Sequence, residues 1–255
     1  MTPQPHLIEC YAGTFGVIVL LVAWELTARL VWQDPATLPA PSQAMVVTFA
    51  VHSPLDILGH AVVSLLRILA GFAVAAVLGV GFGIFCGWSK IASILLRPFV
   101  EILRPIPPLA WIPIAIVWFG LDETSKVFVI VLGAFFPIFT SAWRAMTMVP
   151  PVLIRAARSM DVDGLRLLWQ VAVPAALPDI ATGLRIGFGL SFGILVAAEL
   201  IAAESGMGYL IMEARQLGQL GVAIFGIVLI GLVNLLADRQ LVVIIQRTIG
   251  RWAAV

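Results

Sequence analysis

A charged stretch, PPVLIRAARSMDVDGLRLLWQVAVPAALPD, covers residues 150–179 and lies between two long apolar runs. Two prolines open it, two more stand near its end, and its central ionised side chains are Arg155, Arg158, Asp161, Asp163 and Arg166. Residues 161–164 have the composition of a turn, and Leu165, Leu168 and Trp169 follow at helical spacing. Because charge is costly inside a membrane, we predict a compact helix–turn–helix that contacts a partner in water.

The composition of the chain is typical of a membrane protein with several helical spans. Of its 255 residues, 61% are hydrophobic and 11% are charged, whereas a soluble domain carries about 25% charged residues. Several apolar runs approach the roughly 20 residues that a helix needs to cross a bilayer. Since no stretch is long and polar enough for a separate soluble domain, we predict an all-α polytopic protein with one transmembrane domain over residues 1–255. The net charge of +1 gives no indication of a nucleic-acid partner.

Six spans are expected, over residues 11–30, 60–87, 91–119, 127–146, 180–203 and 221–245. Loops rich in lysine and arginine stay in the cytoplasm, so basic residues set the orientation of the helices. These residues cluster after the second, fourth and sixth spans, at Lys90, Arg97, Arg104, Arg144, Arg155, Arg158, Arg166, Arg247 and Arg251. We therefore predict that both termini and the 150–179 stretch are cytoplasmic.

Small residues recur at helical spacing in two of the spans. The second span carries Gly71, Ala75, Gly79, Gly83 and Gly87, and the fifth carries two lines, Gly183, Gly187 and Ser191 beside Gly189, Gly193 and Ala197. Such spacing lets helix backbones approach closely within a membrane. The pattern favours packing within one subunit, but one of these faces meeting a second copy, or sliding during gating, is an open alternative.

The third span is interrupted by Pro98, Pro105, Pro107, Pro108 and Pro113. Broken backbone at membrane depth is tolerated only where it is buried in protein or lines a watery cavity. Residues 104–113 are therefore a candidate wall of a translocation path, with Pro107, Pro108 and Trp111 as its candidate residues. A kinked packing helix is the alternative interpretation.

Two charged residues within spans are further candidates for the path. Glu199 lies near the outer end of the fifth span, and intramembrane carboxylates are often functional. Its alternative role is simply to reach water. Arg67 lies near the outer end of the second span, where it would attract an anion or pair with a carboxylate, and we favour pairing.

Several chemical functions are disfavoured by the pattern of residues. Residues 189–193 match G-x-S-x-G, but no histidine lies near that depth, so we expect no catalytic residue. Residues 161–164 lack the other ligands of a calcium loop, and Asp163 is expected to cap the next helix instead. Cys10 and Cys86 are placed toward the cytoplasm, so we expect neither a disulfide nor a metal site. Without a phosphate-binding loop, any energy must come from another chain.

The 150–179 stretch resembles the cytoplasmic signature of the permease subunits of binding-protein-dependent ABC importers. That signature is Glu-Ala-Ala, three residues, Gly, nine residues and then Ile-x-Leu-Pro. Here it corresponds to Arg155-Ala156-Ala157, Asp161 in the glycine position, and Val171-Ala172-Val173-Pro174. The spacing, both alanines and the proline match, whereas arginine replaces the glutamate and aspartate replaces the glycine.

Further blocks resemble the branch of this family that imports nitrate, taurine and aliphatic sulfonates. They are residues 105–113 (PIPPLAWIP), 118–120 (WFG), 123–126 (ETSK), 175–178 (AALP), 183–187 (GLRIG), 196–199 (VAAE) and 206–210 (GMGYL). The resemblance covers the chain from about Leu38 to its end. The arginine before the two alanines resembles taurine permeases, so taurine or another sulfonate is the favoured substrate class.

This resemblance implies a six-span permease of the type I importer fold in the bacterial inner membrane, surrounded by lipid. It implies a second permease copy, two cytoplasmic ATPase subunits that bind ATP and Mg²⁺, and an extracytoplasmic substrate-binding protein. The residues implied in ATPase coupling are Arg155, Ala156, Ala157, Arg158, Asp161, Asp163, Gly164 and Pro174. The chain itself would then be no enzyme and hold no cofactor, and Ala157→Glu would uncouple transport without unfolding the protein.

A passive channel or an ion-coupled secondary transporter is the alternative function. Such a protein is expected to place paired charges at mid-membrane and to repeat its broken spans. The sequence shows one clearly broken span, and its intramembrane charges stand near the span ends. These features favour the importer subunit.

Overall fold

The structure, a computed structural model, describes residues 5–34 and 36–249, with side chains from residue 15 to residue 248 apart from residue 35. The side chain of Cys10 and the whole of Arg251 therefore lie outside the described residues. In chain order the helices are α1 (Pro5–Thr27), η1 (Ala28–Trp32), α2 (Pro41–Val51), α3 (Pro54–Trp88), α4 (Lys90–Leu103), η2 (Pro108–Trp111), α5 (Ile112–Phe119), α6 (Glu123–Thr147), α7 (Pro151–Arg158), α8 (Gly164–Leu167), η3 (Leu168–Ala172), α9 (Val173–Ala202), α10 (Met207–Gln216) and α11 (Leu220–Ile249).

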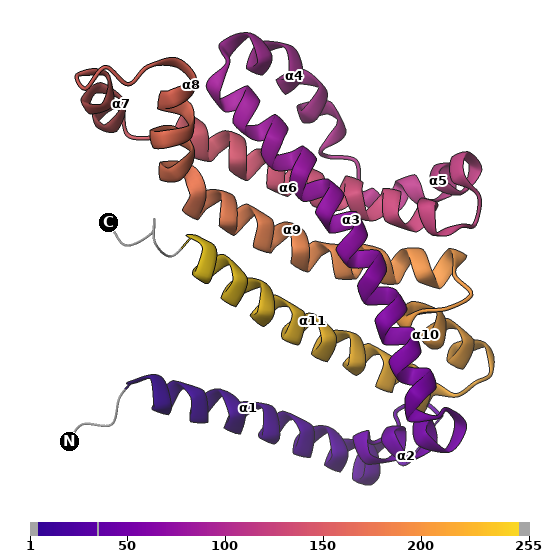
Figure 1. The fold of residues 1–255 in the computed structure, drawn as a ribbon. Coiled ribbons are helices and arrows are strands. Elements are labelled where there is room, and N and C mark those ends of the chain that lie inside the picture. Colours follow the sequence, from indigo (N-terminus) through magenta and orange to yellow (C-terminus); the bar gives the residue numbers. More distant parts are fainter. Residues whose placement is uncertain (1–4, 35, 250–255) are drawn as a thin grey trace.

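Within the described residues, five helices are long and apolar enough to cross a membrane, and a bent pair raises the number to six. The pair consists of residues 90–103 and 108–119, which meet at 85°. These findings confirm the predicted all-α class and the interrupted third span. Figure 1 shows that α1 begins and α11 ends at the same end of the molecule as α7, which we name the α7 end. The opposite end, with α2 and α10, is named the α10 end.

The long helices α3 and α6 pack closely because glycines of α3 face α6. The glycines Gly71, Gly79, Gly83 and Gly87 lie against Ile130, Ile138, Ala142 and Met146. A Cβ added at Gly83 would lie 2.5 Å from the Cβ of Ala142 and 2.9 Å from the carbonyl oxygen of Phe139. The small-residue line of the second span therefore serves packing within one chain, as predicted.

The two small-residue lines of α9 differ in what they face. Gly187 lies against α6, where an added Cβ would be 2.7 Å from Ile138, and Gly183 lies against Ser141. A Cβ added at Gly189 or Gly193, by contrast, would meet no atom within 4 Å. The first line packs inside the described chain, and the second leaves an open face on α9.

The helix that contains α9 begins earlier than the predicted span at residue 180. It runs from Gly164 to Ala202, passing through the π-helical turn η3. Proline in a helix lacks a donor and crowds the carbonyl four residues earlier. The wide turn of η3 directly precedes Pro174 and gives this ring room, so the helix continues. Helices α2 and α10 were also not predicted.

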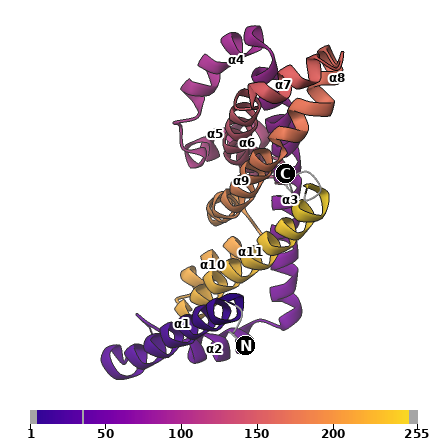
Figure 2. The same ribbon diagram turned by 90° about the vertical axis from the view of Figure 1, so that its left-hand side faces the viewer.

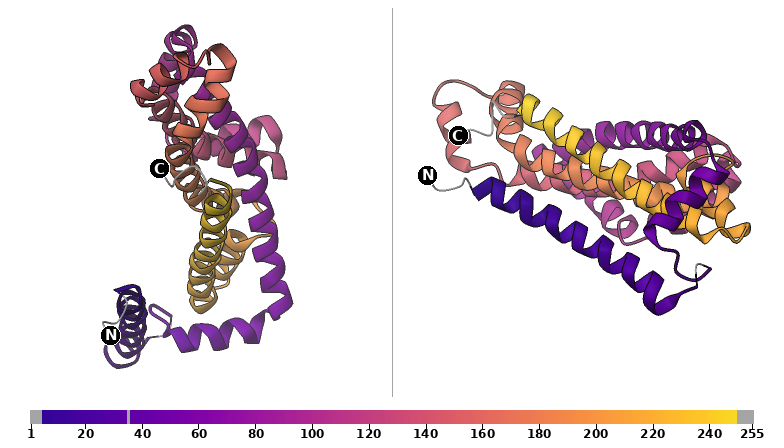
Figure 3. Two further views of the ribbon diagram at one scale, coloured as in Figure 1. Left: turned by 60° about the vertical axis from the view of Figure 1, so that its left-hand side comes forward. Right: turned by 90° about the horizontal axis from the view of Figure 1, so that it is seen from below.

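Helix α1 lies apart from the other long helices in Figures 1 and 3, and it overlaps α10 and α11 only in the projection of Figure 2. Its main contacts are with α2 and with its own continuation η1. Only 6% of the apolar segment Phe15–Trp32 is buried. An exposed surface of this kind is stable next to lipid, where apolar side chains need no protein partner.

Candidate functional site

The turn after α7 explains why aspartate stands at position 161. The N–H of Asp161 donates to the carbonyl of Arg158 at 3.1 Å, and that of Val162 donates to Ala157 at 3.1 Å. These two bonds form a Schellman motif, whose C′ residue adopts the left-handed conformation. Asp161 has φ of 58°, a conformation that glycine adopts freely and aspartate tolerates better than most residues. The aspartate therefore takes over the backbone geometry of a glycine.

We expect the stability of this turn to depend on the residue at position 161. Asp161→Gly should raise the free energy of unfolding by up to about 1 kcal/mol, and Asp161→Val should lower it by about 1–2 kcal/mol, because branched side chains resist positive φ. Thermal unfolding of the purified variants measures both changes. Asp163→Gly is the control, since Asp163 has φ of −130°; equal effects at both positions would contradict the explanation.

The neighbouring coupling candidates are divided between the surface and the interior. Arg155, Ala156 and Arg158 are exposed, whereas Ala157 is only 8% exposed, on a helix whose main contacts are with α8 and η3. Ala157→Glu would therefore disturb the chain's own packing, and the expectation that this variant leaves the fold intact is corrected. Asp163 stands at the N-cap position of α8 but makes no capping bond. Its carboxylate lies 3.5 Å from the Nε of Arg158 instead.

Exposed apolar side chains surround these basic residues at the α7 end. They are Met148, Val152, Met160, Leu165 and Trp169, each at least 59% exposed. Together with Arg155, Arg158 and Arg166 they form what we name the α7 surface. Pro174, half-buried in the first turn of α9, lies beneath it, and Gly164 (φ 59°) begins α8. Apolar anchors rimmed by arginine are typical of protein interfaces.

A group of charged residues, all buried except Glu123, joins α3, α6 and α9 near the α10 end. Arg67 donates from Nη1 to Glu199 Oε1 at 2.7 Å and from Nη2 to Glu123 Oε1 at 2.6 Å, and its Nε also donates to Glu123. Arg67 is 5% exposed and Glu199 1% exposed. We name Arg67, Glu123, Glu199 and Lys126 the Arg67 cluster. The two positive charges of this cluster are equal in number to its two negative charges, so its net charge is zero.

Backbone and hydroxyl donors complete the hydrogen bonds of the Arg67 cluster. Glu199 accepts from Ser64 Oγ at 2.7 Å and from the N–H of Gly208 at 2.8 Å. Arg67 also donates to the carbonyl of Ser205 at 2.6 Å. Gly206 has φ of 119° and no room for a Cβ beside Glu199. Glu199 thus does not reach water, and Arg67 pairs with carboxylates as favoured from the sequence.

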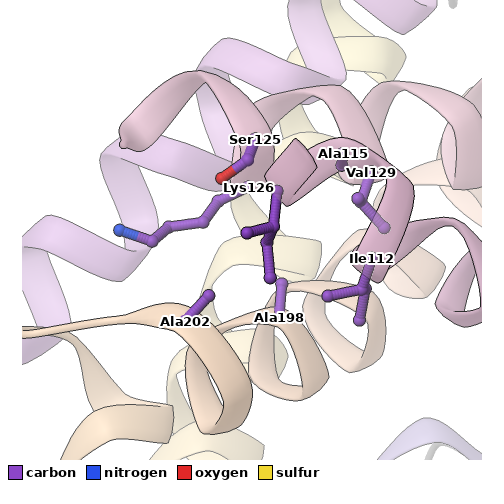
Figure 4. Close-up of a pocket in the computed structure, with 8 residues that line it drawn as sticks. Ile112, Ala115, Ser125, Lys126, Val129, Ala198 and Ala202 are labelled. Carbon is purple, nitrogen blue, oxygen red and sulfur yellow. The ribbon is translucent and has the colours of Figure 1, made fainter. Parts of the chain in front are cut away.

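Lys126 was not among the candidate site residues predicted from the sequence. The signal for it is its spacing of three residues from Glu123, which puts both side chains on one face of a helix. Its Nζ donates to Glu123 Oε1 at 3.0 Å. Figure 4 shows Lys126 extending away from the apolar side chains Ile112, Ala115, Val129 and Ala198. The cavity between these residues has a volume of about 10 Å³, which is hardly enough for one water. This region is therefore a packed junction of helices.

A larger groove lies along the open face of α9. Its volume is about 550 Å³, and its lining includes Pro107, Pro108, Gly133, Leu190 and Gly193. Of the path candidates, Pro107 and Pro108 line this groove. Trp111, Glu199 and Arg67 are not among its lining residues. The structure thus separates the candidates into a groove beside the broken span and a buried ionic junction.

Comparison with known proteins agrees with this architecture. Residues 79–250 match the model of the family described as "Binding-protein-dependent transport system inner membrane component". The chain belongs to this family. As a member of the permease family, it has 37% identity to the taurine transport system permease protein TauC of Escherichia coli, over 98% of this chain and 92% of that protein.

Other permeases are similar to this chain at comparable levels of sequence identity. The putative aliphatic sulfonates transport permease protein SsuC of Bacillus subtilis is 34% identical over 92% of this chain and 84% of its own length. The nitrate import permease protein NrtB of Synechocystis is 34% identical over 88% and 84%. The fold also matches the inward-facing MetNI methionine ABC transporter with a TM-score of 0.60 at 20% identity, over 75% of this chain and 98% of that one. The type I importer permease fold predicted from the sequence is thereby confirmed.

Proposed function

We propose that this permease is the transmembrane subunit of an ATP-driven importer of a small anion, with taurine or another sulfonate as the favoured substrate. The single observation that carries the proposal is the 37% identity to the taurine permease over 98% of this chain. The sulfonate and nitrate permeases among its relatives support the same class of substrate. The compounds in the names of these relatives, taurine, aliphatic sulfonates and nitrate, share a compact anionic group and have no common carbon skeleton.

The α7 surface is the proposed contact with a separate ATPase, which binds ATP and Mg²⁺. Its exposed arginines Arg155 and Arg158 can donate charge-assisted hydrogen bonds to carboxylates of the partner. Exposed Val152 and Trp169 supply apolar area. The small Ala156 lets the backbone of α7 approach closely. The Schellman turn and Pro174 then lead the chain back into the bundle, so that movement of α7 reaches α9.

The α7 end is assigned to the cytoplasm of a bacterial inner membrane. Arg144, Arg155, Arg158 and Arg166 support this orientation, because basic loops remain on the cytoplasmic side. Both termini would then also be cytoplasmic. A substrate-binding protein would dock at the α10 end, and two permease copies would assemble with two ATPase subunits.

Ala156→Glu is expected to lower ATP-dependent uptake by at least about tenfold, since a longer charged side chain would hold the two proteins apart. Ala156 is exposed, so the thermal unfolding temperature of the permease should remain near that of the wild type. Uptake of labelled taurine and ethanesulfonate into liposomes containing the permease–ATPase complex, supplied with the binding protein, measures the effect.

The control is Ala156→Ser, which keeps the side chain small and should retain uptake. The buried variant Ala157→Glu should instead lower the unfolding temperature. Full uptake by Ala156→Glu, with the ATPase still copurifying, would show that α7 does not contact the ATPase at this position. Uptake without any ATPase would favour a passive channel or a secondary transporter.

A further inference from the structure

The groove beside α9 contains one ionisable side chain among its lining residues, Arg104. Arg104 follows α4 directly and precedes the proline-rich break of the third span. The opposite walls come from Gly133 and Pro137 in the middle of α6 and from Leu190 and Gly193 in the middle of α9. Arg104 therefore faces a groove between the middle parts of α6 and α9, and not only the basic cytoplasmic loop in which the sequence placed it.

The acidic side chain nearest in sequence to Arg104 is already paired. Glu101 accepts from Arg97 Nε at 2.6 Å, and the guanidinium of Arg97 lies 5.4 Å from the ring centre of Trp143. Glu101, Arg97 and Arg104 also line a smaller cavity of about 60 Å³ between α4 and α6. Across the side chains that the structure describes, no carboxylate lies within 4 Å of the Arg104 guanidinium. The charge of Arg104 is therefore available to a ligand in the groove.

Unlike Arg104, Arg67 is already paired with carboxylates. Its guanidinium is held by Glu199 and Glu123 and by the carbonyl of Ser205. An anion approaching Arg67 would have to displace two carboxylates that already neutralise it. Of the two cations, only Arg104 can attract an anion without breaking an ion pair.

The shape of the groove also suits a small ligand. A volume of about 550 Å³ lies within the roughly 300–1,000 Å³ of small-molecule sites. Its walls are otherwise apolar or proline, and the open Gly193 adds no side chain to narrow it. Arg104 is exposed on the chain, so its guanidinium is accessible to a ligand in the groove, with which it can form charge-assisted hydrogen bonds.

We propose that Arg104 is the specificity-determining residue of the translocation path and binds the anionic group of the substrate, a sulfonate or an anion of similar size. The proposal rests on the proposed function, because it takes the groove to be the path of an imported anion. The occupant of the groove is the transported solute, and its anionic group complements the charge of Arg104.

The test uses the permease purified with its ATPase and reconstituted in liposomes with the binding protein. Uptake of taurine, ethanesulfonate and nitrate is measured separately. Arg104→Gln should lower uptake of every anion that the wild type imports by at least about tenfold, whereas Arg104→Lys, which keeps the charge, should retain at least roughly a third. Arg97→Gln, two turns earlier on α4, should import at the wild-type rate. Copurification of the ATPase and the thermal unfolding temperature report whether the variants assemble.

The proposal is overturned if assembled Arg104→Gln imports the anions within about twofold of the wild type, a difference too small for a lost charge contact. It is also overturned if Arg104→Lys is as inactive as Arg104→Gln, because the charge is then not what matters. If the wild-type complex hydrolyses ATP but imports none of the three anions, the proposed substrate class fails together with the role of Arg104. If no ATPase copurifies with the wild type, the proposed function itself fails.

Discussion

Arg67→Ala is expected to lower the free energy of unfolding of the purified permease by about 3–5 kcal/mol, because it leaves a buried carboxylate without its cation. Glu199 is 1% exposed, and its oxygens accept from Ser64, Arg67 and Gly208. Neutral donors alone compensate a buried charge poorly. The loss of Arg67 affects Glu123 less than Glu199, since the Glu123 side chain is 60% exposed and keeps its ion pair with Lys126.

Reversible unfolding in mixed detergent micelles measures this effect. Arg97→Ala is the matched control, because the Arg97–Glu101 pair is exposed on both sides and such pairs contribute about 0–1 kcal/mol. The double variant Arg67→Met/Glu199→Gln should recover part of the loss, since it removes both buried charges. If Arg67→Ala costs no more than Arg97→Ala, the Arg67 cluster does not hold the three helices together.

Gly83→Ala is expected to destabilise the permease by about 1–3 kcal/mol through overpacking. The added Cβ would lie 2.5 Å from the Cβ of Ala142, 2.9 Å from the carbonyl oxygen of Phe139 and 3.0 Å from the amide nitrogen of Trp143. Two of these three atoms belong to the backbone of α6 and cannot move aside by a side-chain rotation. The helices α3 and α6 would have to separate along their whole contact.

Gly81→Ala on the same helix is the control for this effect. A Cβ at Gly81 would meet no atom within 4 Å, so the substitution should be neutral or stabilise the helix by up to about 1 kcal/mol. Unfolding of both variants under the same conditions gives the comparison. A similar change at both positions would mean that loss of helical flexibility, and not the α3–α6 contact, sets the stability.

The sequence contains enough information to predict the spans and the break in the third one. Apolar run length is set by bilayer thickness, and a cluster of prolines removes backbone donors in any surroundings. The turn at Asp161 was likewise predictable, because spacing and composition are local signals. The helix start after Asp163 was predicted and is confirmed. Its continuation from Gly164 to Ala202 was not predicted, since the sequence does not show that a π-turn accommodates Pro174.

The candidate site was predictable only in part, because the burial and the contacts of its residues depend on which other helices pack against them. Periodicity assigned Gly187 and Gly193 to two faces of α9, but only the packed fold shows that one meets α6 and the other opens to a groove. Likewise, the sequence does not distinguish Ala156 from Ala157, whereas the structure shows that Ala156 is exposed and Ala157 is buried.

The sequence by itself thus determined an all-α permease with six spans, one of them broken, and a charged helical segment between the fourth and fifth spans. Only the tertiary structure decided that the buried Arg67 is neutralised by Glu199 and Glu123 while Arg104 faces the groove. The physical reason is that span length, helix period and turn chemistry are properties of neighbouring residues. Burial and ion pairing depend on which helices meet, and residues such as Arg67 and Glu199, 132 positions apart, are brought together only by the fold.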